Sequence, residues 1–157
     1  MQKLDSLDLS ILDILQEDAR LPTREIGLKL NKSHSSIQSR IQRLRDEGFI
    51  KKYTVVLDYD KLDFGFMTFT SIQLKDHSED LLNSFEREIV KIPEVMECHY
   101  MTGDYDFMLK IVAKDQHEYH EVLMKKLFAT IGVGRVQTKL VMKTSKSDAR
   151  LPIKSGR

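Results

Sequence analysis

The chain has 157 residues, of which 41% are hydrophobic and 31% charged, and its net charge at neutral pH is +1. This is the composition of a soluble globular protein with enough residues for one domain or two small ones. No apolar run approaches the roughly 18 residues of a membrane-spanning helix, and no signal peptide is recognisable. The single cysteine excludes an internal disulfide, and no Cys/His group has zinc spacing. We expect a cytoplasmic protein without membrane contact, cofactor or metal.

The N-terminal part of the chain predicts three short helices. Asp5 or Ser6 is placed to cap the first, and Asp8 suits the positive end of its dipole. Its predicted buried stripe consists of Leu7, Ile11, Ile14 and Leu15. Thr23 is the predicted N-cap of a second helix, which carries Gly27 in its interior at a cost of about 1 kcal/mol relative to alanine. A tight turn at residues 31–32 then leads to a third helix, capped by Ser33 and ended by Gly48.

The third predicted helix presents an unusual outward face. At about 100° per residue, Ile37, Ile41 and Leu44 form a narrow apolar arc that packs on the other helices, and small neutral residues lie opposite. Residues 31–52 also hold six lysines and arginines against two acidic residues. Most such patches are simply solvated, but small polar residues at the start of a second helix are typical of a helix-turn-helix that reads base edges in the major groove.

We therefore expect this helix to bind double-stranded DNA. Serine and glutamine would contact bases, while arginines and the free N–H groups at the helix start would contact phosphates. The candidate DNA-binding residues are Ser33, His34, Ser35, Ser36, Gln38, Ser39, Arg40, Gln42, Arg43 and Lys51. Residues 49–58 are rich in β-branched and aromatic side chains and predict a strand, whose basic Lys51–Lys52 pair would form the wing of a winged helix-turn-helix.

The second half of the chain predicts an α+β domain with the order β-α-β-β-α-β, which is ferredoxin-like. Strands are expected over residues 66–74, 95–101, 107–113 and 136–143, with helices capped by Ser78 and Asp115. We predict a winged helix-turn-helix over residues 1–57, a hinge over residues 58–64, a ferredoxin-like ligand-sensing and oligomerisation domain over residues 65–145, and a polar, frayed tail over residues 146–157.

The N-terminal segment resembles the winged helix-turn-helix of the leucine-responsive/asparagine-responsive (Lrp/AsnC, or feast/famine) family of regulators. The landmarks are Leu4–Asp5, Asp8, Ile11–Leu12, Asp18–Arg20, Glu25–Ile26, Ser33, Arg40, Leu44 and Gly48–Ile50. The second half is similar to that family's sensing domain through "TGDYDFMLKI" and "GVGRVQTKLVM". Two departures are Gly27, where alanine is usual, and Asn31–Lys32, where glycine-leucine is more common. The resemblance implies a transcription regulator.

The segment "MTGDYD" predicts a second site. Asp104 and Asp106 would bind the ammonium group of a ligand, and backbone amides would bind its carboxylate. Tyr105 and Phe107 would form the walls of the cavity. The alternative is a plain hairpin turn whose acidic side chains are solvated. The resemblance favours an amino-acid effector bound here between subunits, and adds a polar position on the last strand. The candidate effector residues are Met101, Thr102, Gly103, Asp104, Tyr105, Asp106 and Thr138.

A four-stranded sheet covered by helices on one face leaves its other face bare. Phe69, Tyr100 and Met108 would cover that face by pairing with a second copy of the chain. We therefore expect a homodimer, and the resemblance implies dimers that assemble into octamers. A dimer would present two third helices to a pseudo-palindromic DNA site.

Two other functions remain open at this stage. Sirohaem decarboxylases resemble the same family, and His99 with Tyr100 would be the acting residues of such an enzyme. A sensing module that acts through protein partners would bind DNA weakly and independently of Arg40 and Arg43. The basic third helix favours the DNA-binding, non-enzymatic interpretation, with no catalytic residue assigned.

Overall fold

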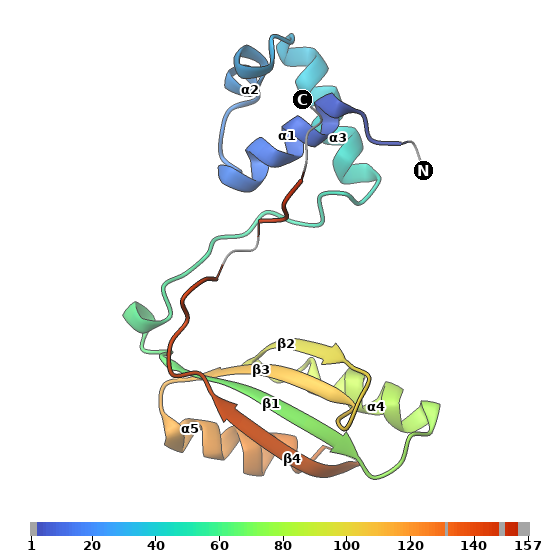
Figure 1. Ribbon diagram of the computed structural model, residues 1–157, viewed down its shortest axis with the longest axis vertical. Coiled ribbons are helices and arrows are strands. Elements are labelled where there is room, and N and C mark those ends of the chain that lie inside the picture. The colour runs from blue at the N-terminus through green and yellow to red at the C-terminus, as the bar shows by residue number, and fades with distance from the viewer. Residues whose placement is uncertain (1–2, 131, 148–149, 154–157) are drawn as a thin grey trace. The chain divides into compact units, whose positions relative to one another are not determined.

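The computed structural model describes residues 3–130, 132–147 and 150–153. The chain divides into two compact units (Figure 1). One contains the described residues up to Val56 together with those from Lys146 onward, and the other spans Leu57–Ser145. The chain thus leaves the first unit just before the predicted hinge and returns to it near the C-terminus.

The first unit is built from three helices, α1 (Ser6–Glu17), α2 (Thr23–Leu30) and α3 (His34–Asp46). Their core is formed by four fully buried aliphatic side chains, Ile11, Ile26, Ile37 and Leu44. The three predicted helices are therefore confirmed, as is the apolar arc that seats α3.

The helix ends follow the predicted caps with one exception. Asp5 caps α1 in a capping box, because its side chain accepts from the Asp8 N–H while the Asp8 side chain accepts from the Asp5 N–H. Ser33 caps α3 by accepting from the Ser36 N–H. The predicted cap at Thr23 is wrong, because Pro22 is the N-cap residue and Thr23 is the first residue of α2.

The predicted strand over residues 49–58 is wrong for the single chain. Residues 51–58 have no regular secondary structure, so no wing ribbon forms around Lys51. A strand requires a partner for its backbone hydrogen bonds, and sequence propensity cannot supply one. The segment exposes a run of apolar side chains, with Val55 77% and Val56 81% exposed. A short 3₁₀ turn, η1 (Asp60–Leu62), follows it.

The second unit has the predicted β-α-β-β-α-β order (Figure 1). Its elements are β1 (Phe66–Leu74), α4 (Glu79–Ile89), β2 (Val95–Tyr100), β3 (Phe107–Ala113), α5 (Gln116–Glu121) with a following π-helical turn η2 (Val122–Leu127), and β4 (Val133–Leu140). All pairings are antiparallel, and the strand order is β2-β3-β1-β4. The ferredoxin-like fold is confirmed. The last strand lies three residues earlier at each end than predicted.

The two faces of this sheet differ. Alternate residues such as Ile72 on β1 and Leu109 on β3 are fully buried with Phe85 of α4, so both helices cover one face. On the other face Phe69 is 37% exposed, and it pairs in register with Lys110 of β3 and Lys139 of β4. Side chains on this open face line the candidate effector pocket described below.

The C-terminal segment is not wholly frayed. The Arg150 guanidinium lies 3.0 Å from an Asp13 carboxylate oxygen on α1. The Gln16 side chain accepts from the Leu151 N–H at 2.7 Å and donates to the Leu151 carbonyl at 3.3 Å. The prediction of a frayed tail is therefore wrong for residues 150–151; residues 148–149 and 154–157 lie outside the described residues.

Candidate DNA-binding surface and effector pocket

The start of α3 presents short polar side chains to solvent. The Ser33 hydroxyl accepts from the Ser36 N–H at 3.3 Å and lies 3.2 Å from the Ser35 hydroxyl, which fixes the first turn. Gln42 is further along and donates to Asp46 at 2.8 Å. Among the candidate DNA-binding residues, the exposed ones are Ser33, His34, Ser35, Gln38, Ser39, Gln42 and Lys51. Small side chains allow a helix backbone to approach base edges closely.

The turn before α3 brings two helices into close contact. Asn31 takes a left-handed conformation (φ 53°) and ends α2, and the Lys32 N–H donates to the Gly27 carbonyl at 2.9 Å. Glycine at position 27 leaves room for this turn, because an added Cβ would stand 2.7 Å from the Lys32 carbonyl oxygen. Gly27 of α2 is therefore in contact with the turn at residues 31–32, which sets where α3 begins.

The arginines predicted to contact phosphates have protein partners in this structure. The Arg40 guanidinium lies 2.7 Å from carboxylate oxygens of both Asp5 and Asp8, and Arg43 lies 2.5 Å from the other oxygen of Asp8. Arg40 donates hydrogen bonds to the carboxylates of Asp5 and Asp8, and these bonds raise the pKa of Arg40 above its ordinary value. Both side chains keep about a third of their surface exposed, 28% and 30% respectively.

Sequence reasoning missed this role of Asp8. The signal was present, because Asp8 lies on the same face of α1 as Ile11, three residues away, and an acidic residue on a buried helix face requires a partner. Arginines bordering the apolar arc of α3 are the natural partners for such a carboxylate.

In the second unit, the loop between β2 and β3 borders a pocket of about 280 Å³. Its lining comes from the loop and from the open face of three strands: Ser71, Met101, Thr102, Asp104, Tyr105, Phe107, Met108, Gln137 and Lys139. Gly103, with φ +121°, occupies backbone space that other residues rarely adopt. The structure thus brings together four of the seven candidate effector residues, and it adds a lysine from β4.

Asp106 anchors the loop from inside. It is 8% exposed, accepts from the Leu74 N–H at 2.7 Å and lies 2.9 Å from the His77 ring. Its carbonyl also accepts from the Met101 N–H at 2.8 Å, which closes the loop. Both carboxylate oxygens of Asp106 are thus engaged by the protein, and Asp104 is the exposed acid of the loop.

Thr138 is not brought together with the loop. Its hydroxyl lies 2.5 Å from the Tyr119 hydroxyl of α5, which in turn lies 3.0 Å from Thr70, so Thr138 points to the helix-covered face. Its neighbours Gln137 and Lys139 line the pocket, because successive strand residues alternate between faces. Thr138 therefore faces away from the pocket that its two neighbours line.

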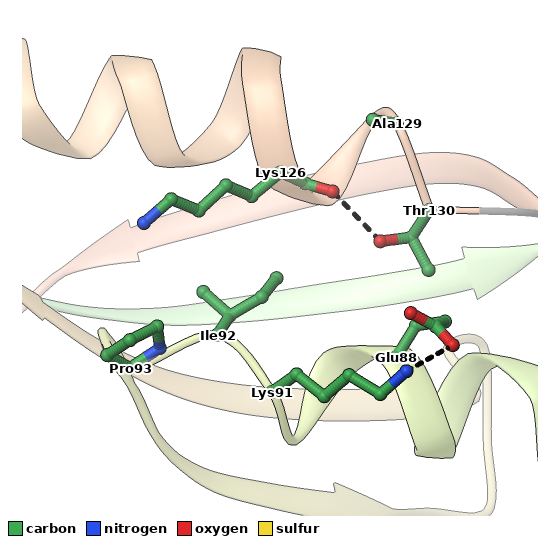
Figure 2. A pocket seen from close by; sticks show the side chains of 7 residues that line it. All are labelled: Glu88, Lys91, Ile92, Pro93, Lys126, Ala129 and Thr130. Carbon is green, nitrogen blue, oxygen red and sulfur yellow. Dashed lines mark hydrogen bonds and ion pairs between the residues drawn. The ribbon is translucent and has the colours of Figure 1, made fainter.

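A second hollow lies elsewhere in this unit. Its volume is about 450 Å³. Figure 2 shows the residues that line it, which are Glu88, Lys91, Ile92, Pro93, Lys126, Ala129 and Thr130. The Lys91 ammonium is paired with Glu88 at 2.7 Å, and the Lys126 ammonium with Glu94 at 2.5 Å. Both cationic groups of the hollow are thus already neutralised by glutamates, and it shares no residue with the loop pocket.

Within the described residues, no group of three or more His, Cys, Asp or Glu side chains could hold a metal ion. No helix in the described part of the chain is long and apolar enough to cross a membrane. His99 and Tyr100, considered as an enzyme site, lie on β2; the His99 ring is 3.2 Å from Glu97, and the Tyr100 ring packs on Phe107 at a centroid distance of 5.2 Å.

A helix-turn-helix unit joined to a ferredoxin-like unit with a loop pocket defines a ligand-responsive, DNA-binding transcriptional regulator. The AsnC-type helix-turn-helix domain matches residues 4–45, and the Lrp/AsnC ligand binding domain matches residues 67–151. The chain belongs to the Lrp/AsnC family of transcriptional regulators.

Curated relatives and solved structures agree with this assignment. Transcriptional regulator AzlB of Bacillus subtilis is 36% identical over 150 residues, which cover 96% of each chain. The leucine-responsive regulatory protein of Escherichia coli is 34% identical over 152 residues, covering 97% of this chain and 93% of the relative. A transcriptional regulator from Neisseria meningitidis, solved in complex with L-Met, is 28% identical with a TM-score of 0.89, covering 96% of this chain and 97% of the other. An AsnC family regulator from Agrobacterium tumefaciens is 32% identical with a TM-score of 0.88, covering 95% and 97%.

Proposed function

We propose that the exposed serines and glutamines of α3 read base edges in the major groove of double-stranded DNA. The observation that carries this is the outward face of α3, which is exposed, uncharged and made of short side chains around Ser35, Gln38 and Ser39. Ser33, His34 and Ser36 lie at the capped first turn, whose free N–H groups suit a phosphate. Lys51, exposed beyond α3, supplies a further phosphate contact.

Selection of bound genomic fragments, followed by binding of variants, tests this surface. Gln38→Ala is expected to relax sequence preference at one position of each half-site, because a bidentate glutamine–adenine contact discriminates by about 1–3 kcal/mol. Lys51→Ala is the matched control, expected to weaken binding to all sequences equally and to reduce the salt slope by about 1. Equal loss of preference in both variants would argue against base reading by α3.

We also infer that the loop pocket binds an amino acid with an apolar side chain. Lys139 and the backbone N–H groups of the loop are suited to its carboxylate, Asp104 to its ammonium group, and Met101 with Met108 to its side chain. A solved relative is a complex with L-Met, which supports this ligand class. Titration with each of the twenty amino acids, by calorimetry, tests the proposal; absence of binding by every apolar amino acid would refute it.

The same pocket lies on the open face of the sheet, which suits a contact between subunits. Phe69 on this face is 37% exposed and Met101 beside the pocket is 42% exposed, so a second copy of the chain would bury apolar surface there. Tyr100 does not belong to this face, because it pairs in register with Phe107, which lies in the helix-covered core. We propose a homodimer that assembles into octamers, with the amino acid changing the assembly. The ligand can change the assembly only if it binds dimers and octamers with different affinity. Sedimentation of the protein with and without L-Met measures whether the proportion of dimers and octamers changes.

The proposed activity is binding, exercised in the cytoplasm, with no catalytic step. His99 is engaged by Glu97, and Lys110 lies 3.1 Å from the other oxygen of the same carboxylate, so this part of β2 forms a surface ion-pair network. A tetrapyrrole enzyme would instead carry visible absorbance and fail to retain duplex DNA. Absorbance spectra of the purified protein, together with DNA retention, distinguish the two activities.

A further inference from the structure

Asp8 is the one fully buried acidic residue in the described part of the chain. One carboxylate oxygen lies 2.7 Å from Arg40, and the other lies 2.5 Å from Arg43 and accepts from the Asp5 N–H at 3.1 Å. Burial of an unpaired carboxylate is costly, so Asp8 holds its place because two guanidinium groups of α3 compensate its charge. The carboxylate therefore ties the start of α1 to the middle of α3.

The contacts of Asp8 restrict the rotation and sliding of α3, which the apolar core alone does not fix. Ile37 and Leu44 bury α3 without directional preference, since hydrophobic contacts allow a helix to rotate or slide by small amounts. The charge-assisted hydrogen bond from Arg40 to Asp8 is directional, and Arg43, one turn further along α3, forms an ion pair with the same carboxylate. Together these two contacts set the rotation of α3 and its position along its axis. The rotation of α3 decides which side chains face outward.

We propose that Asp8 is a positioning residue for sequence recognition. It fixes the angle at which Gln38 and Ser39 meet the bases, and it holds Arg40 and Arg43 away from phosphates that any DNA sequence would offer. The inference rests on the proposed contact of α3 with DNA and goes beyond it, because it assigns the discrimination between sequences to a residue that touches no DNA.

A positioning role for Asp8 predicts different effects on non-specific affinity for DNA and on the ratio of specific to non-specific affinity, whereas a purely structural role predicts a loss of both specific and non-specific binding. In Asp8→Asn, which has nearly the same shape, the neutral amide no longer balances two guanidiniums, and these are exposed enough to swing outward. Affinity for DNA of any sequence is then expected to stay equal or rise, with the salt slope steeper by about 1–2. The ratio of specific to non-specific affinity is expected to fall at least about tenfold.

The experiment uses the full-length protein and two fluorescent duplexes, one selected by the wild type from a randomised library and one of the same composition in scrambled order. Binding is measured by anisotropy over a range of salt concentrations. Asp13→Asn is the matched control, because it removes the same charge from α1 at a partly exposed position paired with Arg150. The control is expected to leave the specificity ratio within about twofold.

Three outcomes decide the matter. A fall in the ratio with undiminished non-specific binding supports the proposal, whereas an equal loss on both duplexes, or an unchanged ratio, overturns it. If Asp8→Asn does not fold, as judged by its thermal melt, Arg40→Gln decides, since it removes one of the two guanidinium groups that hold Asp8 and leaves the Asp8–Arg43 pair in place. Arg40→Gln is then expected to lower the ratio by a smaller factor, and an equal loss on both duplexes or an unchanged ratio overturns the proposal. A wild type that selects no sequence would refute base reading itself, separately from the role of Asp8.

Discussion

Gly27 lies directly against the backbone of Lys32. A Cβ at position 27 would stand 2.7 Å from the Lys32 carbonyl oxygen, and it would also meet the Ile37 side chain at 3.7 Å. Backbone atoms in a hydrogen-bonded turn cannot move aside as the end of a flexible side chain can. This contact explains why the second helix tolerates a glycine that lowers its intrinsic stability.

Gly27→Ala is therefore expected to lower the free energy of unfolding by about 1–2 kcal/mol, because overpacking outweighs the gain of about 1 kcal/mol in helix propensity. Urea unfolding measures the change. Combining it with Asn31→Gly is expected to recover part of the loss, since glycine lets the left-handed turn widen. A Gly27→Ala protein at least as stable as the wild type would show that the turn adapts freely.

Thr138→Val tests which face of the sheet binds the ligand. The change removes a hydroxyl that bonds Tyr119 on the helix side, so we expect a loss of about 0.5–1.5 kcal/mol of stability and no change in affinity for L-Met. Lys139→Met, on the neighbouring position, is expected to weaken L-Met binding at least about tenfold with little change in stability. The reverse pattern, measured by calorimetry and thermal melting, would place the ligand on the helix side.

Asp106→Asn should affect both stability and binding. The carboxylate accepts from the Leu74 N–H and contacts His77, and an amide can replace only part of this, so we expect a loss of about 1–3 kcal/mol. Because the anchor also shapes the loop, affinity for L-Met is expected to fall as well. Asp104→Asn is the matched control, since its exposed side chain should change ligand affinity alone. Hydrogen exchange of residues 101–106 shows whether the loop loosens as expected.

The Cys98 thiol is expected to be unreactive in the folded protein. Burial, followed by the negative charge of Glu86, raises its pKa from 9.0 to about 11, so the nucleophilic thiolate is scarcer at every pH below that value. At pH 8 we expect alkylation by iodoacetamide to be about a hundredfold slower than in the urea-unfolded chain. The chain has one cysteine, so intact-mass measurement reports this site alone. Equal rates in the folded and unfolded chain would contradict the assignment.

Local sequence signals predicted the elements whose structure depends on local interactions. Strands β1 and β3 lie where the alternating pattern placed them, and the caps at Asp5 and Ser33 follow from side chains that bond their own helix. The strand expected over residues 49–58 failed for the opposite reason. Its β-branched side chains favour an extended backbone, but a strand forms only where another backbone accepts its hydrogen bonds.

The predictions of site residues also differ according to whether they depend on local or on long-range interactions. The outward face of α3 and the loop at Gly103 follow from spacing and glycine chemistry. The engagement of Arg40 by α1 and the face on which Thr138 lies depend on residues distant in sequence, which charge patterning cannot assign. An acidic residue within an apolar stripe, as at Asp8, is the one signal in the sequence that indicated a buried ion pair.

The polypeptide connects the sensing unit to the helix-turn-helix unit twice, and non-covalent contacts with α1 anchor the second connection. The polypeptide departs near Val56 and comes back near Lys146, and Arg150 and Leu151 are held by Asp13 and Gln16. A protein joined by one flexible tether lets its halves swivel without consequence, whereas a double tether resists twisting. If the proposed effector strains the sensing unit, the C-terminal segment would give that strain a second covalent path to α1.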